Sequence, residues 1–272
     1  MAPPLDDLAV AVQAAAQRMA VLVRRLERPS AVALGTWDST DVALHAAQAV
    51  ETITGLVRGE GPGLDDVSQL ATLTTDLVHR EGERDLDGLA ERIELGALAL
   101  VDDVRALASG ASRTWLVRHV QASPSTILGH VLNELVVHSW DIARAQGVAW
   151  PIPGRQAALV LDAFLFPILG HLGRQLVDPV TAAGVNATFD VRIRGGGRHL
   201  LRFAGGDLAV ESVDGHRPRA GVDCRLSADP SALLLVAWGR RSQWPAIARG
   251  QLLAWGRHPW LGLRLRSLLV NP

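Results

Sequence analysis

The chain has 272 residues, 48% hydrophobic and 20% charged, a composition that excludes a disordered chain and is typical of a globular protein with a sizeable core. Its longest apolar run, residues 232–238, is far shorter than the ~20 residues that a membrane-spanning helix needs, and no basic flank precedes the apolar part of the N-terminus, so we expect a cytoplasmic protein without a membrane partner. The one cysteine, Cys224, excludes an intramolecular disulfide and a multi-cysteine metal site.

Charge is divided unevenly along the chain, although the net charge is only -1. Residues 1–180 hold 14 Arg and 22 acidic residues, whereas residues 181–272 hold 13 Arg and 6 acidic residues. This division indicates two differently built halves, of which the basic one could attract a small anion. We expect no nucleic-acid partner, because no Arg-rich run or aromatic-interleaved basic stretch is present. The absence of Lys and the abundance of Ala, Gly, Val and Leu fit a GC-rich, actinobacterial source.

The first half is predicted to form an up-and-down helical bundle over residues 1–180. Its apolar residues recur with the period of amphipathic helices, and loops separate helices of about 20 residues. In the fourth helix, Ser123 is the expected N-cap, Pro124 the first residue and Gly147 the end. The expected helices span residues 5–27, 39–59, 85–110, 124–146 and 155–175.

The pattern changes near residue 185, which indicates a small α+β domain over residues 181–272. Apolar and polar residues alternate there, with Gly-rich turns at 195–197 and 205–206, and this predicts an antiparallel meander. A strand over 221–228 then leads into a helix with Asp229 as N-cap and Pro230 as first residue. A final helix is expected over residues 259–269.

Polar side chains occupy apolar faces of two bundle helices. Glu134 and His138 lie one turn apart, about 40° around the helix axis, on a face lined with aliphatic residues. A buried carboxylate requires a positive partner or a metal, and His45 lies on a similar apolar face of the second helix. If both helices face one interior, these three residues can converge into a metal site of two nitrogens and one oxygen. Such a site leaves a position open for water or substrate, as catalytic zinc requires.

Other interpretations of these residues stay open. A buried histidine can be a hydrogen-bonded core residue, and Glu134 with His138 can be a buried ion pair without a metal. Asp41 either orients a ligand histidine or is a first-turn acid that interacts with the helix dipole. Asp141 and His130 lie at the edge of the same face as Glu134, where each can support the site or belong to the helix surface.

The stretches that carry these residues resemble a known family. GTWDSTDVALHAA resembles the W-(S/T)-x-x-D-V-x-x-H-(L/A) signature of the mycothiol-dependent maleylpyruvate isomerase family, and NELVVHSWDIARA its E-x-x-x-H-x-x-D-(L/I)-A-x-A signature. The stretches LSADPSALLLVAWGRR and ARGQLLAWGRHPWLGLRLRSL resemble the C-terminal domain of that family, which is similar to sterol-carrier-type α+β folds. The family belongs to the DinB-like superfamily of metal-dependent thiol S-transferases.

The resemblance implies a DinB-like helical bundle followed by a sterol-carrier-like α+β domain. The family's metal ligands fall on His45, Glu134 and His138, the metal is usually Zn²⁺, and mycothiol or another small thiol is the cosubstrate. The implied activity is metal-dependent isomerisation or S-conjugation of a small electrophile, such as the carboxylate-bearing maleylpyruvate, by a thiol whose pKa the metal lowers. Arg240 in the W-G-R motif is the expected partner of a substrate carboxylate.

Two further functions remain as alternatives. Two histidines and one carboxylate also describe the metal triad of non-haem Fe(II) oxygenases, although those triads usually lie on β-scaffolds. The chain could also be a non-catalytic protein that binds a small molecule or lipid in its second domain, with a metal that is structural or lost.

Overall fold

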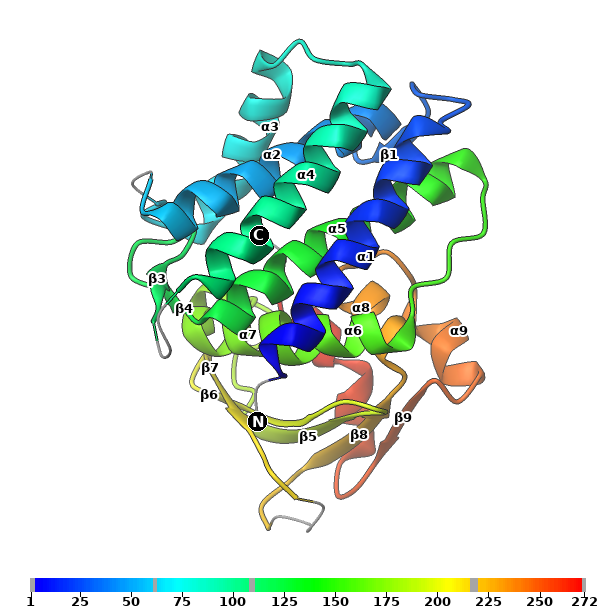
Figure 1. Cartoon of the computed structure of the whole chain (residues 1–272). Coiled ribbons are helices and arrows are strands. Elements are labelled where there is room, and N and C mark those ends of the chain that lie inside the picture. The colour runs from blue at the N-terminus through cyan, green and yellow to red at the C-terminus, as the bar shows by residue number, and fades with distance from the viewer. Residues whose placement is uncertain (1–2, 61–62, 108–110, 216–219, 271–272) are drawn as a thin grey trace. The chain divides into compact units, whose positions relative to one another are not determined.

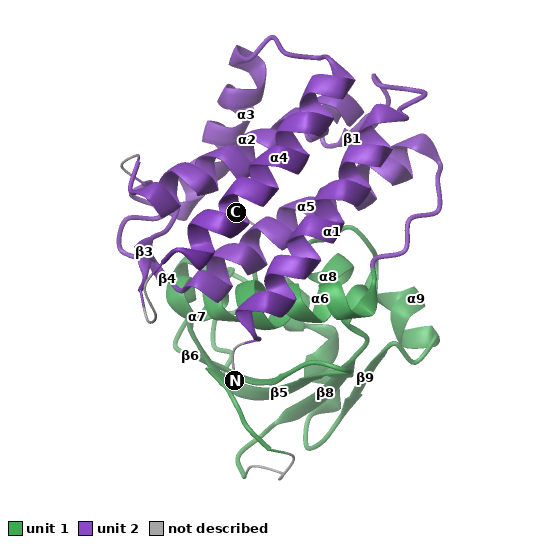
Figure 2. Ribbon diagram, viewed as in Figure 1, with its two compact units in different colours: residues 1–2, 153–272 green, residues 3–152 purple. Residues whose placement is uncertain are grey.

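The computed structural model describes residues 3–60, 63–107, 111–215 and 220–270, and it confirms the predicted fold class of a helical part followed by an α+β part (Figure 1). The chain divides into two compact units (Figure 2). We call residues 3–152 the helical unit and residues 153–272 the sheet unit.

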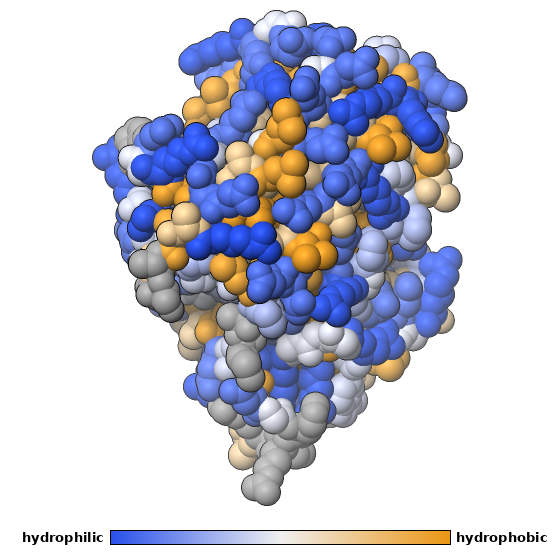
Figure 3. Space-filling view, in the orientation of Figure 1, coloured by the Kyte–Doolittle hydropathy of each residue, from blue (hydrophilic) through white to orange (hydrophobic). Residues whose placement is uncertain are grey.

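Four long helices form the core of the helical unit. The first two, α1 and α2, each pack against both of the others, α4 and α5, so the four surround one apolar interior. The outer surface over α1 and α4 is mostly hydrophilic, with isolated apolar side chains of the kind common on globular proteins (Figure 3). The long helices are α1 (Leu5–Arg24), α2 (Ser39–Arg58), α4 (Leu86–Arg105) and α5 (Pro124–Gln146).

Local signals set the ends of α2 and α5. Asp38 accepts hydrogen bonds from the backbone of Thr40 and Asp41, and the Asp41 side chain accepts one from the Asp38 N–H, which completes a capping box. The predicted limits of α5 are confirmed: Ser123 caps it, Pro124 begins it and the left-handed Gly147 (φ 73°) ends it. The predicted end of α4, Gly110, lies outside the described residues.

The helical unit also holds short elements that the sequence pattern did not predict. Helix α3 (Leu70–Arg80) buries only Val78, so it contributes little to the apolar interior. It follows a 3₁₀ turn, η1 (Val67–Gln69). Two antiparallel ribbons complete the unit, β1 (Val32–Leu34) with β2 (Trp37–Asp38), and β3 (Arg113–Thr114) with β4 (Gln121–Ala122).

A five-stranded sheet with the order β7-β6-β5-β8-β9 is the centre of the sheet unit. The predicted meander is confirmed, because β5, β6 and β7 pair antiparallel in sequence. The next strand, β8, pairs parallel to β5, and the unpredicted β9 pairs antiparallel to β8. The strands are β5 (Ala187–Ile193), β6 (Arg198–Ala204), β7 (Asp207–Ser212), β8 (Cys224–Ala228) and β9 (Leu252–Trp255).

The expected fifth helix of the bundle packs on this sheet instead. Asp162 accepts hydrogen bonds from the Gly197 N–H and from His199 Nε2, both at 2.8 Å. The compact units therefore divide between residues 152 and 153, whereas we expected a domain boundary between 180 and 181. The segment comprises α6 (Gly154–Val160), a π-helical turn η2 (Leu161–Leu165), α7 (Phe166–Leu172) and a 3₁₀ turn η3 (Gly173–Leu176).

This segment, Gly154–Leu176, is long and apolar enough to span a membrane by length and composition alone, which a search for uninterrupted apolar runs does not reveal. However, 61% of its most apolar window is buried inside the structure, as in the core helix of a soluble protein. Its length and apolar character are therefore weak evidence for a membrane span.

The predicted helix over residues 259–269 is wrong. Two 3₁₀ turns, η4 (Pro259–Leu263) and η5 (Leu265–Leu268), take its place. Gly262 lies so close to the sheet that a Cβ there would be 2.9 Å from both Leu226 and Ala254, so packing on the sheet determines this path. The predicted cap of α8 (Pro230–Ala237) by Asp229 is confirmed, and α9 (Gln243–Ala248) follows it.

Candidate metal centre

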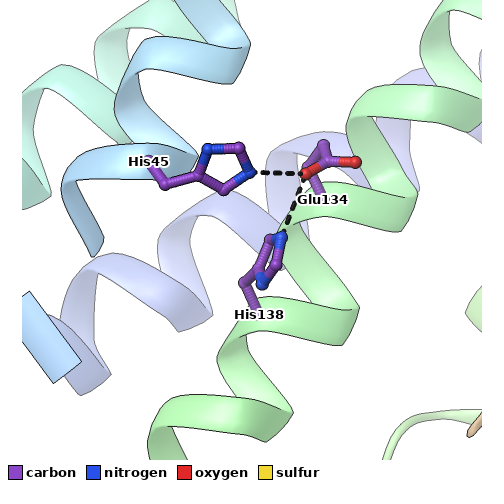
Figure 4. Close-up of side chains that lie close together, drawn as sticks. All are labelled: His45, Glu134 and His138. Atoms are coloured by element: carbon purple, nitrogen blue, oxygen red, sulfur yellow. Dashed lines mark ion pairs between the residues drawn. The ribbon is translucent and has the colours of Figure 1, made fainter. Parts of the chain in front are cut away.

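Three side chains from two helices of the helical unit converge on one point. His45 comes from α2, whereas Glu134 and His138 lie one turn apart on α5 (Figure 4). Glu134 Oε2 lies 3.4 Å from His45 Nε2 and 3.1 Å from His138 Nε2. One ligand atom from each of the three residues lies within 4.8 Å of the others, a spacing that could hold a metal ion.

The two oxygens of Glu134 have different partners. Oε2 faces His45 and His138, whereas Oε1 lies 3.3 Å from His130 Nε2 and 3.3 Å from Asn133 Nδ2. His130 and Asn133 therefore hold the carboxylate so that one oxygen points toward the two histidines of the cluster. Carboxylates that bind metals are oriented by hydrogen bonds of this kind.

Asp141 orients His138 from the other side of the imidazole ring. Its Oδ2 lies 3.2 Å from His138 Nδ1, and its side chain is almost completely buried. A carboxylate on Nδ1 leaves Nε2 directed at Glu134, and metal-binding histidines usually have such a partner on their second nitrogen. This contact favours the interpretation that Asp141 supports the candidate metal site, and not that it is an ordinary surface residue of the helix.

The charges of the cluster follow from burial and hydrogen bonding. Burial lowers the pKa of His45, which favours the neutral imidazole. Burial alone would raise the pKa of Glu134, but hydrogen bonds from His130, His138 and His45 hold that pKa well below its usual range. Burial also opposes the charged form of His138, yet its hydrogen bonds with Asp141 and Glu134 raise the pKa of His138 to about 9. Without a metal, the cluster therefore holds a carboxylate beside a protonated His138 at neutral pH.

Two tryptophan rings lie beside histidines of the cluster and its surroundings. The Trp37 ring lies 5.0 Å from the His45 ring, and the Trp115 ring lies 4.8 Å from the His130 ring. The side chains of His45, Glu134 and His138 remain 12%, 13% and 9% exposed. The cluster is thus largely buried, and charge interactions within it are stronger than those on an open surface.

Two other predicted site residues have hydrogen bonds and ion pairs of their own. Asp41 takes part in the capping box with Asp38 and forms an ion pair with Arg84 at 3.2 Å, contacts that favour its helix-capping role. Arg240 belongs to the sheet unit, where its Nη1 donates a hydrogen bond to the Trp238 carbonyl at 3.0 Å.

The donor set suits a divalent metal such as zinc. Two imidazole nitrogens and one carboxylate oxygen are a common ligand set of catalytic zinc, and three protein ligands leave a position for an exogenous molecule. Within the described parts of the chain, no second group of histidine, cysteine and acidic side chains has this spacing. The same donor set is also compatible with iron.

Sequence reasoning undervalued His130 and missed Asn133 and Trp37. His130 precedes Glu134 by four residues, the spacing that also links Glu134 to His138, so helical periodicity contained the signal for a second histidine. Asn133 is adjacent to Glu134 in sequence, and neighbouring helix residues point in different directions, so periodicity alone does not reveal their contact. Trp37 reaches His45 from outside the helices, which only the folded chain shows.

The chain resembles known proteins both in sequence and in fold. The family model for the mycothiol maleylpyruvate isomerase N-terminal domain matches residues 8–143, half of the chain. The crystal structures of the mycothiol-dependent maleylpyruvate isomerase and of a histidine-to-alanine mutant of it both resemble the chain, each with a TM-score of 0.55 and 13% sequence identity over 93% of both chains. At this identity, the structural likeness shows a shared fold. No curated protein matches the sequence.

Proposed function

Because this chain belongs to the mycothiol maleylpyruvate isomerase family, a family of enzymes, we propose that it binds a divalent metal through His45, Glu134 and His138. The metal would promote the reaction of a thiol with a small electrophile. The proposed thiol is mycothiol or a close analogue, and the proposed metal is Zn²⁺. The observation that carries the proposal is the convergence of these three side chains inside the domain that the family model matches.

The thiol must come from outside the chain. Cys224 is fully buried in the sheet unit, and burial raises the pKa of its thiol, so it is a poor nucleophile at neutral pH. A divalent metal bound by the cluster would lower the pKa of an incoming thiol. His130, Asn133 and Asp141 would hold the ligand side chains in place, and Trp37 would limit the access of water.

The proposed reaction is addition of the thiolate sulfur to one carbon of a conjugated double bond. The electrons of the π bond move onto the adjacent carbonyl group and leave a single bond, about which the substrate can rotate. Elimination of the sulfur then restores the double bond and releases the thiol, which gives isomerisation. If the adduct is protonated on carbon and released instead, the result is S-conjugation.

Arg240 is the proposed partner of a substrate carboxylate. The hydrogen bond from its Nη1 to the Trp238 carbonyl limits the freedom of the guanidinium group, and a guanidinium binds a carboxylate through two parallel hydrogen bonds. An Arg240→Gln variant would then have a higher KM for a carboxylate substrate and an unchanged metal content.

The test combines elemental analysis with turnover. The purified chain is expected to contain one zinc ion and to convert maleylpyruvate only when mycothiol is present, and His45→Ala and Glu134→Gln should lose both properties. Matched controls are His79→Ala on α3 and Glu91→Gln on α4, which replace exposed side chains of the same unit. Stoichiometric iron with oxygen-dependent turnover, or unchanged metal content in His45→Ala, would contradict the proposal.

A further inference from the structure

A serine, a histidine and an aspartate form a chain of contacts in the sheet unit. Ser212 on β7 is directly opposite His199 on β6, and its Oγ lies 3.2 Å from His199 Nδ1. On the other side of the ring, His199 Nε2 lies 2.8 Å from Asp162 Oδ1. We call these three residues the Ser212 triad. A hydroxyl beside an imidazole whose second nitrogen meets a carboxylate is the arrangement that activates a serine nucleophile.

The turn between β5 and β6 holds the carboxylate of Asp162 in place. Its Oδ2 accepts a hydrogen bond from the Gly197 N–H at 2.8 Å. A Cβ at Gly197 would be 2.8 Å from Oδ1, and one at Gly196 would be 3.0 Å from Oδ2, so the two glycines leave room that other residues would fill. Asp162 also lies in the π-helical turn η2, and such turns are frequent at functional sites.

The imidazole ring of His199 is fixed between its neighbours. The Phe166 ring stacks on it, with centroids 4.1 Å and planes 17° apart. The side chains of His199 and Asp162 are only 3% and 12% exposed, so water competes little for the contact between them. A carboxylate at Nε2 favours a proton on that nitrogen, which leaves Nδ1 to accept the proton of the Ser212 hydroxyl.

Ser212 is the member of the triad that a solute can reach. It is exposed at the end of β7, which is an edge strand of the sheet. The neighbouring Val213 N–H donates to the Arg198 carbonyl, so His199 and Ser212 form a non-hydrogen-bonded pair and the Ser212 N–H points away from β6. That N–H could donate to the oxyanion that forms when Ser212 attacks a carbonyl group.

We infer that the Ser212 triad is a second catalytic site, which hydrolyses small carboxylic esters. Ser212 Oγ forms a bond to the carbonyl carbon while its proton passes to His199 Nδ1. The bond from that carbon to the alcohol oxygen then breaks, and the alcohol leaves with the same proton. Water attacks the acyl group on Ser212 in the same way, which gives the carboxylic acid and restores the hydroxyl. A short acyl group suits an exposed serine, because it needs no deep pocket.

Hydrolysis of p-nitrophenyl acetate by the full chain, at neutral pH and in excess chelator, tests this site. We expect turnover that Ser212→Ala lowers by about 100-fold or more, and Asp162→Asn should also lower it because the ring proton is no longer held on Nε2. Ser242→Ala is the matched control and should leave the rate unchanged. Ser242 is an exposed serine of the same unit whose hydroxyl caps α9 instead of facing a histidine.

Diisopropyl fluorophosphate gives a second readout, since it bonds to an activated serine and releases fluoride. Mass spectrometry of the digested protein should locate the label on Ser212, and Asp162→Asn should slow labelling although the hydroxyl is still present. Hydrolysis that persists in Ser212→Ala, or an unlabelled Ser212, would overturn the inference and leave Asp162 and His199 as an anchor between the helical segment and the sheet. Hydrolysis that the chelator abolishes would also overturn it, because the triad needs no metal.

Discussion

Glu134 shows how single atoms define the candidate site. One oxygen faces His45 and His138, while the other is held by His130 and Asn133. The carboxylate therefore directs one oxygen at the two histidines in a fixed orientation, so that this oxygen would hold a bound metal. The neighbouring His138 carries the proton that balances this carboxylate in the metal-free protein.

Metal binding should release a proton from His138. Its pKa of about 9 means that His138 is protonated at neutral pH, and a metal can bind Nε2 only after that proton leaves. The apparent affinity for zinc should therefore rise by up to about tenfold per pH unit below pH 9. Calorimetry in buffers of different ionisation enthalpy measures the released protons, and a release of none would contradict the assignment.

The same pKa shift predicts how the stability of the metal-free protein depends on pH. His138 has an ordinary pKa of 6.5, and folding raises it to about 9. Its contribution to stability is fully present below pH 6.5 and is lost as the pH rises through 9, because the folded state then loses its excess bound proton. Chemical unfolding in the presence of a chelator, measured between pH 6 and 10, should show this decline. His138→Gln should largely remove it.

Asp141→Asn tests the residue that orients His138. Loss of this carboxylate removes the hydrogen bond that fixes the His138 ring, so zinc affinity should fall by about 10–100-fold. Competition with a chromogenic chelator measures the change. Asp76→Asn on α3, an exposed residue paired with Arg80, should leave the affinity unchanged; an equal loss in both variants would argue against the orienting role.

The site depends on where α2 and α5 begin. Each helix has a hydrogen-bonded N-cap, Asp38 for α2 and Ser123 for α5, and a left-handed glycine after its last turn. These signals set the ends of each helix, while the apolar faces set its rotation about its axis. Together they place His45 on the same interior as Glu134 and His138.

Asp38→Ala tests the start of α2. Removal of a side chain that accepts two backbone hydrogen bonds should lower the free energy of unfolding by about 1 kcal/mol. Urea unfolding, monitored by circular dichroism, measures the effect. Asp102→Ala within α4 is the control, because Asp102 is exposed and Ala has a higher helix propensity, so no loss is expected there.

The whole helical unit should gain stability from a bound metal, since the ligands come from two helices far apart in the chain. A metal that binds only the folded unit stabilises it by about 4 kcal/mol when its free concentration is a thousand times its Kd. Calorimetric unfolding should show a transition that moves to lower temperature when a chelator is added. His79→Ala should retain this shift and His45→Ala should lose it; a shift that persists in His45→Ala would place the metal elsewhere.

The four long helices, the meander and the three converging residues were predictable from the sequence, because periodicity and capping are local properties of the chain. The packing partner of residues 154–176 was not predictable. The helical pattern is the same whether the helix packs in a bundle or, through Asp162, on a sheet. Likewise, Gly262 and the sheet determine the two 3₁₀ turns that replace the predicted final helix.

The sequence by itself determined which side chains are polar on apolar faces, and therefore which residues can form the centre. The tertiary structure decided their partners: His130 and Asn133 on Glu134, Asp141 on His138, and Arg84 on Asp41. It also brought Asp162, His199 and Ser212 together from a helical turn and two strands that are adjacent only after folding. Partner choice depends on packing between distant segments, which local patterns do not contain.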